Sequence, residues 1–123
     1  MPGGKPSDQL RLEHRIDDGA AVVDADGEID VYTSGLLRDR LLALVDEGHC
    51  RLVVNLKSVS FIDSTGLGVL VGVWHRLLPC DGVLAVAAPT SKVRGVFDTA
   101  GLTNPLSIYE STAEAVQACR LAR

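Results

Sequence analysis

Apolar residues recur along the chain at two different spacings, one typical of β-strands and the other of α-helices. Residues 10–16 alternate apolar and polar side chains, the period of two that is typical of a half-buried strand. Asp17-Asp18-Gly19 is a turn sequence, and residues 20–25 predict a second strand that completes a hairpin. Gly27 is expected to end that strand.

The rest of the chain alternates between helix and strand patterns. Apolar positions three or four residues apart predict helices at 33–47, 64–78, 90–100 and from 111 onward. Short apolar runs predict strands at 51–56, 82–87 and 106–109. Strands joined by helical crossovers pair in parallel. We therefore predict an α/β fold with a small, mostly parallel sheet, an antiparallel N-terminal strand and about four α-helices.

Length and charge narrow the class of protein further. A chain of 123 residues suffices for one domain, which we assign to 10–123 after a flexible N-terminal tail at 1–9. Twelve Lys and Arg residues against sixteen Asp and Glu, with no basic stripe, argue against direct nucleic-acid binding. The longest apolar run, 67–74, is too short and too glycine-rich to cross a membrane, and the N-terminus lacks a signal peptide. We expect a cytoplasmic protein.

Three cysteines, Cys50, Cys80 and Cys119, show neither a C-x-x-C pair nor the spacing of metal ligands. A scattered, odd set in a chain without a leader is typical of reduced, half-buried thiols, and that is our expectation. A redox role stays open, because Cys50 and Cys80 each precede a predicted strand. If those strands are parallel neighbours, the two thiols lie at the same end of the sheet.

The segment Asp63-Ser64-Thr65-Gly66-Leu67-Gly68 lies where a strand passes into a helix. Asp63 is a good N-cap, which puts Ser64 at the first helical position with its hydroxyl outward. Free backbone N–H groups and the helix dipole favour a negative group there. A phosphoserine at this position is compatible with the helix.

The faces of the predicted helix 64–78 differ in character. At about 100° per residue, the core face contains Leu67, Leu70, Val71, Trp74, Leu77 and Leu78. Ser64, Gly68, Gly72 and His75 share another side, flanked by Thr65, Val69 and Val73. Interior glycines cost about 1 kcal/mol each relative to alanine, so these two need a reason. Either the helix packs closely there against a neighbouring helix, or the glycines form a smooth surface for a partner protein.

Catalytic and nucleotide-binding interpretations are less well supported. Ile62 occupies the position of the first glycine of the G-x-S-x-G nucleophile motif. His75 lies about 16 Å along the same helix, and His49 about 20 Å away at the far end of a strand. These distance estimates do not exclude His14, on the predicted hairpin, as a base for Ser64. The dinucleotide fingerprint lacks its third glycine at Val71 and its acidic residue. No metal or cofactor is expected.

The same residues carry a family resemblance. Residues 61–68, Phe-Ile-Asp-Ser-Thr-Gly-Leu-Gly, resemble the signature of anti-sigma factor antagonists of the STAS (sulfate transporter and anti-sigma factor antagonist) family. Gly27-Glu28-Ile29-Asp30 resembles the second hallmark of that family, and 52–56 and 96–102 fit as well. The resemblance covers residues 10–116.

This resemblance implies a partner-switching protein that is not an enzyme. In the family, a serine-kinase anti-sigma factor binds either its sigma factor or the unphosphorylated antagonist. The kinase uses ATP to phosphorylate the serine matching Ser64, and the phosphorylated antagonist then dissociates from it. A metal-dependent serine phosphatase restores the unphosphorylated antagonist. The resemblance further implies that the residue matching Asp30 takes part in kinase recognition. The expected partner surface consists of Asp30, Asp63, Ser64, Thr65, Gly66, Gly68, Val69 and Gly72.

Two alternatives belong to other classes. A small hydrolase or phosphotransferase that uses Ser64 would turn over substrate without a partner. A scaffold subunit of a larger signalling assembly would carry a further sensor domain, for which 123 residues leave no room. We favour the interpretation that the protein is a free-standing antagonist that can be phosphorylated.

Overall fold

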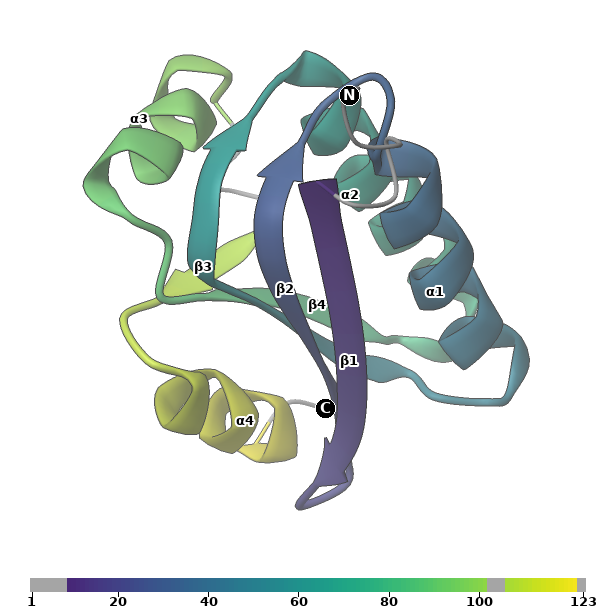
Figure 1. Ribbon diagram of the computed structural model, residues 1–123. Helices are drawn as coiled ribbons and strands as arrows, with labels where there is room; N and C mark the ends of the chain where they lie inside the picture. The colour runs from purple at the N-terminus through teal and green to yellow at the C-terminus, as the bar shows by residue number, and fades with distance from the viewer. Residues whose placement is uncertain (1–8, 102–105, 122–123) are drawn as a thin grey trace.

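The computed structural model describes residues 9–101 and 106–121, which form a five-stranded sheet with helices on both faces (Figure 1). Residues 1–8 of the expected N-terminal tail lie outside the described residues. In chain order the elements are β1 (Leu10–Asp17), β2 (Ala20–Ile29), α1 (Ser34–Asp46), β3 (Arg51–Ile62), α2 (Ser64–Leu77), the short 3₁₀ helix η2 (Leu78–Cys80), β4 (Val83–Ala87), α3 (Ser91–Thr99), β5 (Ser107–Tyr109) and α4 (Thr112–Leu121).

The strands lie side by side in the order of the sequence, β1-β2-β3-β4-β5. β1 and β2 form the antiparallel hairpin, whereas β2, β3, β4 and β5 pair in parallel. Each of the three parallel steps contains one α-helix, followed by η2 in the second step, as expected, since parallel neighbours need a crossover connection. The predicted fold class is confirmed. One consequence matters for function: the ends of β2 and β3 emerge at the same edge of the sheet, where Ile29 pairs with Ile62.

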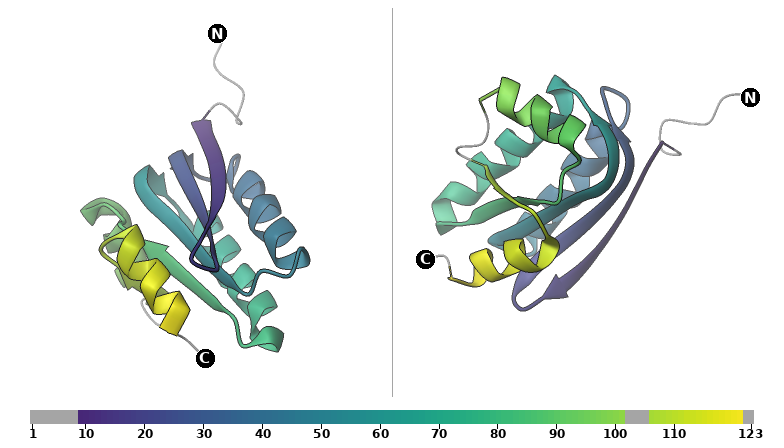
Figure 2. Two further views of the ribbon diagram at one scale, coloured as in Figure 1. Left: turned by 90° about the horizontal axis from the view of Figure 1, so that it is seen from below. Right: turned by 90° about the vertical axis from the view of Figure 1, so that its left-hand side faces the viewer.

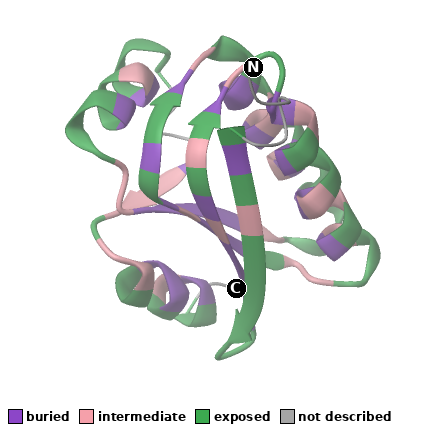
Figure 3. Ribbon diagram, viewed as in Figure 1, coloured by how far each residue is buried: buried purple, intermediate pink, exposed green. Residues whose placement is uncertain are grey.

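Apolar side chains form a core on each face of the sheet. The larger core holds the buried residues of α1, α2 and α3, among them Leu37, Leu70 and Phe97. The smaller core lies under α4, where Ala115, Val116 and Cys119 pack on small strand residues. Figure 2 shows α4 on the opposite side of the sheet from α1 and α2. In Figure 3 the inward sides of these helices are buried and their outward sides exposed.

Strands β2 and β3 are longer than the sequence predicts. Gly27 does not end β2, which continues to Ile29, and β3 continues from Leu56 to Ile62. The two extensions pair with each other through register shifts, one of them between Gly27 and Glu28. Gly27 has φ +128°, and a Cβ there would lie 1.9 Å from the carbonyl oxygen of Gln9. Glycine therefore permits an irregular strand here where the sequence indicated a break.

The core face of α2 differs in part from the prediction. Leu67, Leu70 and Leu77 are buried as expected, and Val71 and Trp74 are partly buried. Leu78 is 49% exposed, because it starts η2 and no longer follows the period of α2. Val73, expected on the outer side, is 1% exposed, since α1 packs along that flank of α2.

The cysteines depart from the expectation of three reduced thiols. Cys50 and Cys80 form a disulfide, and Cys119 is a free, buried cysteine. The physical reason is the register of the sheet: β3 and β4 are parallel neighbours that begin with the pair Arg51 and Val83. The two cysteines therefore meet at the end of the sheet where both strands start.

Candidate functional site

The start of α2 is fixed by Asp63. This residue has extended backbone geometry, and its Oδ1 accepts hydrogen bonds from the backbone N–H of Thr65 (2.9 Å) and of Gly66 (3.2 Å). Its carbonyl oxygen accepts the first helical bond, from the N–H of Leu67 at 3.1 Å. The predicted N-cap is confirmed. Ser64 is consequently the first helical residue, and both it and Thr65 are exposed.

The end of β2 holds this helix start from the side. The N–H of Asp63 donates to the carbonyl oxygen of Ile29 at 3.2 Å. Gly66 is buried, and a Cβ there would lie 2.6 Å from Cγ2 of Ile29 and 2.8 Å from Cγ1 of Ile62. A side chain at Gly66 would push the helix away from the sheet. Gly66 thus supports the exposed residues around it from beneath and does not itself form surface.

Asp30 organises the loop between β2 and α1. Its Oδ1 accepts from the N–H groups of Tyr32 (2.9 Å) and Thr33 (3.0 Å). In return its own N–H donates to Oγ1 of Thr33 at 2.9 Å, and that buried hydroxyl donates to the carbonyl oxygen of Glu28 at 2.8 Å. The carboxylate shapes its own loop, a role the sequence analysis missed. The signal was available, because an aspartate three residues before a threonine at a helix start is typical of such turns.

Exposed apolar side chains flank these polar residues. Val31 is 62% exposed and Tyr32 is 71% exposed, both on the loop that Asp30 organises, and Phe61 near the end of β3 is 38% exposed. The loops after β2 and β3 lie at the top of the molecule in Figure 1, at the same edge of the sheet. Sequence reasoning missed this feature, since only the topology brings these side chains to the edge that carries Ser64.

Gly68 and Gly72 lie on the open side of α2. Both are exposed, and a Cβ on either would meet no described atom within 4 Å outside the local helix backbone. Close packing of these glycines against a described helix is therefore excluded, which leaves the alternative of a smooth, accessible surface. With Thr65, partly buried Val69 and Arg38 of α1, they line a shallow groove of about 370 Å³ between α1 and α2.

A second depression, of about 470 Å³, is lined by Ser64 itself. It is mostly apolar and runs between α2 and α3. Its lining includes Leu67 and Val96, and a single lysine, Lys92, in the first turn of α3. Ser64 therefore lines the same depression as the ammonium-bearing Lys92, while its neighbour Thr65 lines the groove between α1 and α2.

No histidine pairs with Ser64 as a catalytic base in the described part of the chain. Nδ1 of His14 lies 3.2 Å from Nη1 of Arg40, and Nε2 of His49 lies 3.8 Å from a carboxylate oxygen of Glu47. The ring of His75 is tilted by 43° against that of Trp74, with 4.9 Å between the ring centres. Each described histidine is engaged away from the serine, so the geometry offers no Ser–His pair. Among residues 9–101 and 106–121 no cluster of three or more His, Cys, Asp or Glu side chains suits a metal ion. None of the described helices is long and apolar enough to span a bilayer.

Comparison with known proteins fits this architecture. The family model described as the STAS domain matches residues 11–115. The chain belongs to the STAS domain family. Among curated relatives, an anti-sigma-B factor antagonist of Bacillus subtilis is 37% identical over 91 residues, covering 74% of this chain and 83% of the relative.

Solved structures lead to the same STAS fold. An anti-sigma factor antagonist from Mycobacterium paratuberculosis superimposes with a TM-score of 0.85 and 29% identity, over 93% of this chain and 97% of that one. The anti-sigma factor antagonist SpoIIAA, in its unphosphorylated form, gives a TM-score of 0.76 and 25% identity, over 90% and 96% of the two chains. The family resemblance seen in residues 27–30 and 61–68 is thereby confirmed.

Proposed function

We propose that this STAS protein is an anti-sigma factor antagonist, a binding protein and not an enzyme, whose complex is ended by phosphorylation of Ser64. The observation that carries the proposal is the position of this serine. Ser64 is exposed at the first residue of a capped helix, and the next residue, Thr65, lines a groove in which a Cβ on Gly68 or Gly72 would meet no described atom outside the neighbouring residues and the local helix backbone. The curated and structural relatives described above, which are antagonists of anti-sigma factors, support the choice of partner.

The proposed contact surface follows the accessible residues. Ser64, Thr65, Gly68, Val69 and Gly72 form its centre, where the partner can approach the α2 backbone closely. Asp30 and Asp63 contribute charge at its edge, and Gly66 keeps α2 in place beneath it. Exposed Val31 and Tyr32 add apolar area to the surface, and aromatic residues such as tyrosine are enriched in protein interfaces.

The switch itself is electrostatic in this proposal. The anti-sigma factor acts as a serine kinase: the Ser64 hydroxyl attacks the γ-phosphorus of ATP, its proton passes to a base of the kinase, and ADP leaves. The new dianionic group gains little from the helix start, because Asp63 already accepts the N–H groups of Thr65 and Gly66. At a close interface the phosphate would lose water against a partner surface that receives a neutral hydroxyl, so the complex dissociates. A serine phosphatase that transfers the phosphoryl group to water regenerates Ser64.

The test is phosphosite mapping with the cognate kinase. Affinity capture on the immobilised protein, in the presence and absence of ATP, identifies the anti-sigma factor, and mass spectrometry then locates the phosphate. We expect incorporation at Ser64, its loss in Ser64→Ala, and its retention in Thr65→Ala, which removes the neighbouring exposed hydroxyl. Equal incorporation into wild type and Ser64→Ala would refute the proposal.

A further inference from the structure

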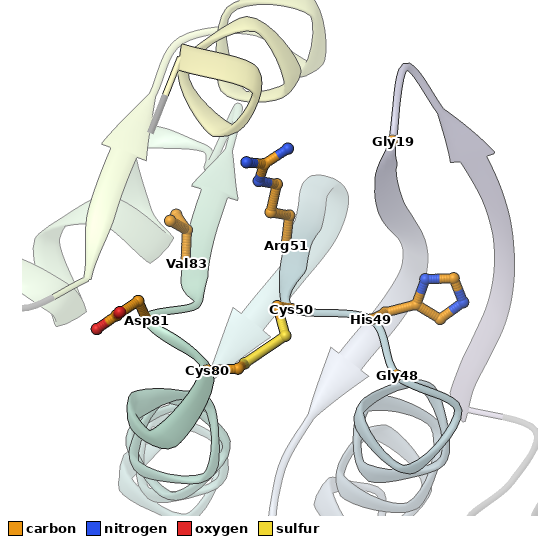
Figure 4. Close-up of a pocket in the computed structure, with 8 residues that line it drawn as sticks. All are labelled: Gly19, Gly48, His49, Cys50, Arg51, Cys80, Asp81 and Val83. Atoms are coloured by element: carbon orange, nitrogen blue, oxygen red, sulfur yellow. A yellow bond between two sulfur atoms is a disulfide. The ribbon is translucent and has the colours of Figure 1, made fainter. Parts of the chain in front are cut away.

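The Cys50–Cys80 disulfide lies at the opposite end of α2 from Ser64. Cys50 directly precedes β3, and Cys80 ends η2 after α2, with 6.3 Å between the two Cα atoms. Figure 4 shows the bridge linking the turn after α2 to the start of β3. The cysteines are 30 positions apart in the sequence, and the segment between them contains β3, the Asp63 cap and all of α2. The disulfide thus closes the unit that carries Ser64.

Backbone contacts hold the two cysteines together independently of the sulfur–sulfur bond. The N–H of Val83 donates to the carbonyl oxygen of Cys50 at 2.8 Å, and the N–H of Gly82 donates to that of Leu77 at 2.8 Å. A Cβ on Gly82 would lie only 2.5 Å from the Cys50 oxygen, so this approach depends on glycine. The sheet sets the spacing of the cysteines through hydrogen bonds that do not involve sulfur.

The site also suits the reduced state and is open to a reagent. Sγ of Cys80 lies 3.4 Å from the carbonyl oxygen of Leu77, which can accept a hydrogen bond from the thiol once it forms. Cys80 is exposed and Cys50 partly buried, and both line a depression of about 440 Å³ shared with His49 and Arg51 (Figure 4). Cys119, by contrast, is buried, and this burial raises the pKa of its thiol, so it reacts poorly.

We propose that Cys50 and Cys80 form a site of reversible thiol–disulfide exchange with a dithiol reductant. A thiolate of the reductant attacks Sγ of exposed Cys80, the protein disulfide breaks, and Cys50 leaves as a thiolate that takes up a proton. The second thiolate of the reductant then attacks its own sulfur in the mixed disulfide and releases Cys80, which is also protonated. Two electrons and two protons pass to the protein, and the reductant becomes a disulfide. A disulfide oxidant reverses the reaction.

The consequence of exchange is a change in the stability of the unit between the cysteines. A cross-link that closes a chain of this length restricts the unfolded state and so favours the folded one. Reduction should loosen the C-terminal end of α2 and η2, whereas Ser64 lies about 20 Å away along the helix. This site therefore acts separately from phosphorylation, and its test does not depend on the proposed function.

The experiment measures the exchange equilibrium in glutathione redox buffers. The full chain carries Cys119→Ser, so that Cys50 and Cys80 are its only cysteines. It is equilibrated in native buffer and in urea, its free thiols are trapped by alkylation, and the products are analysed by mass spectrometry. We expect the disulfide to be favoured about 30- to 1000-fold more in the native state than in urea. Dithiothreitol should open it without loss of native circular dichroism and should lower the melting temperature by about 5–20 °C.

Cys50→Ser in the same background is the matched control, because it cannot form the disulfide. Its melting temperature should not change when dithiothreitol is added. Three results would overturn the proposal. The pair could remain fully alkylatable in oxidising buffer, the disulfide could resist dithiothreitol in the native protein, or reduction could unfold the chain. The last result would make the bridge a requirement for folding instead of a site of exchange.

Discussion

At the scale of single residues, Asp30 and Asp63, which follow the paired strand ends Ile29 and Ile62, each combine a charge with a fixed place in the backbone. Oδ1 of Asp63 caps α2, and Oδ1 of Asp30 receives two N–H groups of its own loop. Removing either carboxylate therefore changes local structure as well as charge. An alanine variant that lost partner binding would not reveal whether the partner recognises the negative charge or the local backbone structure.

Substituting Asp30 in two ways separates these properties. Asp30→Asn keeps a side-chain oxygen that can accept from the N–H groups of Tyr32 and Thr33, so we expect a loss of less than about 1 kcal/mol in unfolding free energy. Asp30→Ala leaves both groups without that acceptor and should cost about 1–2 kcal/mol. Urea unfolding measures the difference. If the kinase recognises the negative charge of Asp30, the folded Asp30→Asn variant should bind the kinase more weakly in a calorimetric titration. Equal destabilisation by Asn and Ala would mean that the loop itself requires the charge.

At the scale of elements, α2 contains glycines with opposite requirements. A Cβ on Gly66 would collide with Ile29 and Ile62, whereas one on Gly68 would meet nothing nearby. Sequence periodicity placed both in the same helix without distinguishing them, because the difference arises from where β2 ends. The burial of Val73 was missed for a similar reason, since it depends on α1 lying alongside α2.

The contrast predicts opposite effects on stability and a loss of binding. Gly66→Ala should destabilise the fold by about 1–3 kcal/mol through overpacking. Gly68→Gln should leave the fold intact or slightly more stable, since glycine is the poorer helix former, while its long side chain blocks the partner. Thermal melts and calorimetric titration with the anti-sigma factor measure both effects. Ala113→Gln, an exposed position on α4 across the sheet, is the control that should bind normally. Unfolding of Gly68→Gln would contradict the surface assignment.

At the scale of the whole molecule, the order of elements and the parallel topology followed from the sequence, whereas contacts between distant segments did not. Helical and strand periods are local properties, and the crossover rule turns them into a sheet. The extended ends of β2 and β3, by contrast, exist because they pair with each other through irregular registers. The Cys50–Cys80 bridge likewise depends on the pairing of Arg51 with Val83. The signature around Ser64 was found because its cap and helix start are encoded within a few residues.

The whole molecule also decides what a charge at Ser64 does, and Ser64→Asp tests this. In the free protein a negative group at a helix start usually stabilises by about 0.3–1 kcal/mol. Asp63, which already accepts the N–H groups of Thr65 and Gly66, should cancel much of that gain, so the melting temperature should move by only a few degrees. Ser64 is exposed, and its charge therefore stays hydrated until a partner covers it.

In the complex the same charge must lose its water against a surface that receives a neutral hydroxyl. An unpaired charge at an interface costs about 2–5 kcal/mol, equivalent to about a 30- to 4000-fold loss of affinity. Ser64→Asp should therefore fold normally and fail to hold the anti-sigma factor, while Ser64→Ala still binds. Calorimetric titration and thermal melts of both variants measure the two effects together. Undiminished binding by a folded Ser64→Asp variant would rule out an electrostatic switch, and loss of binding through unfolding would point to a conformational one.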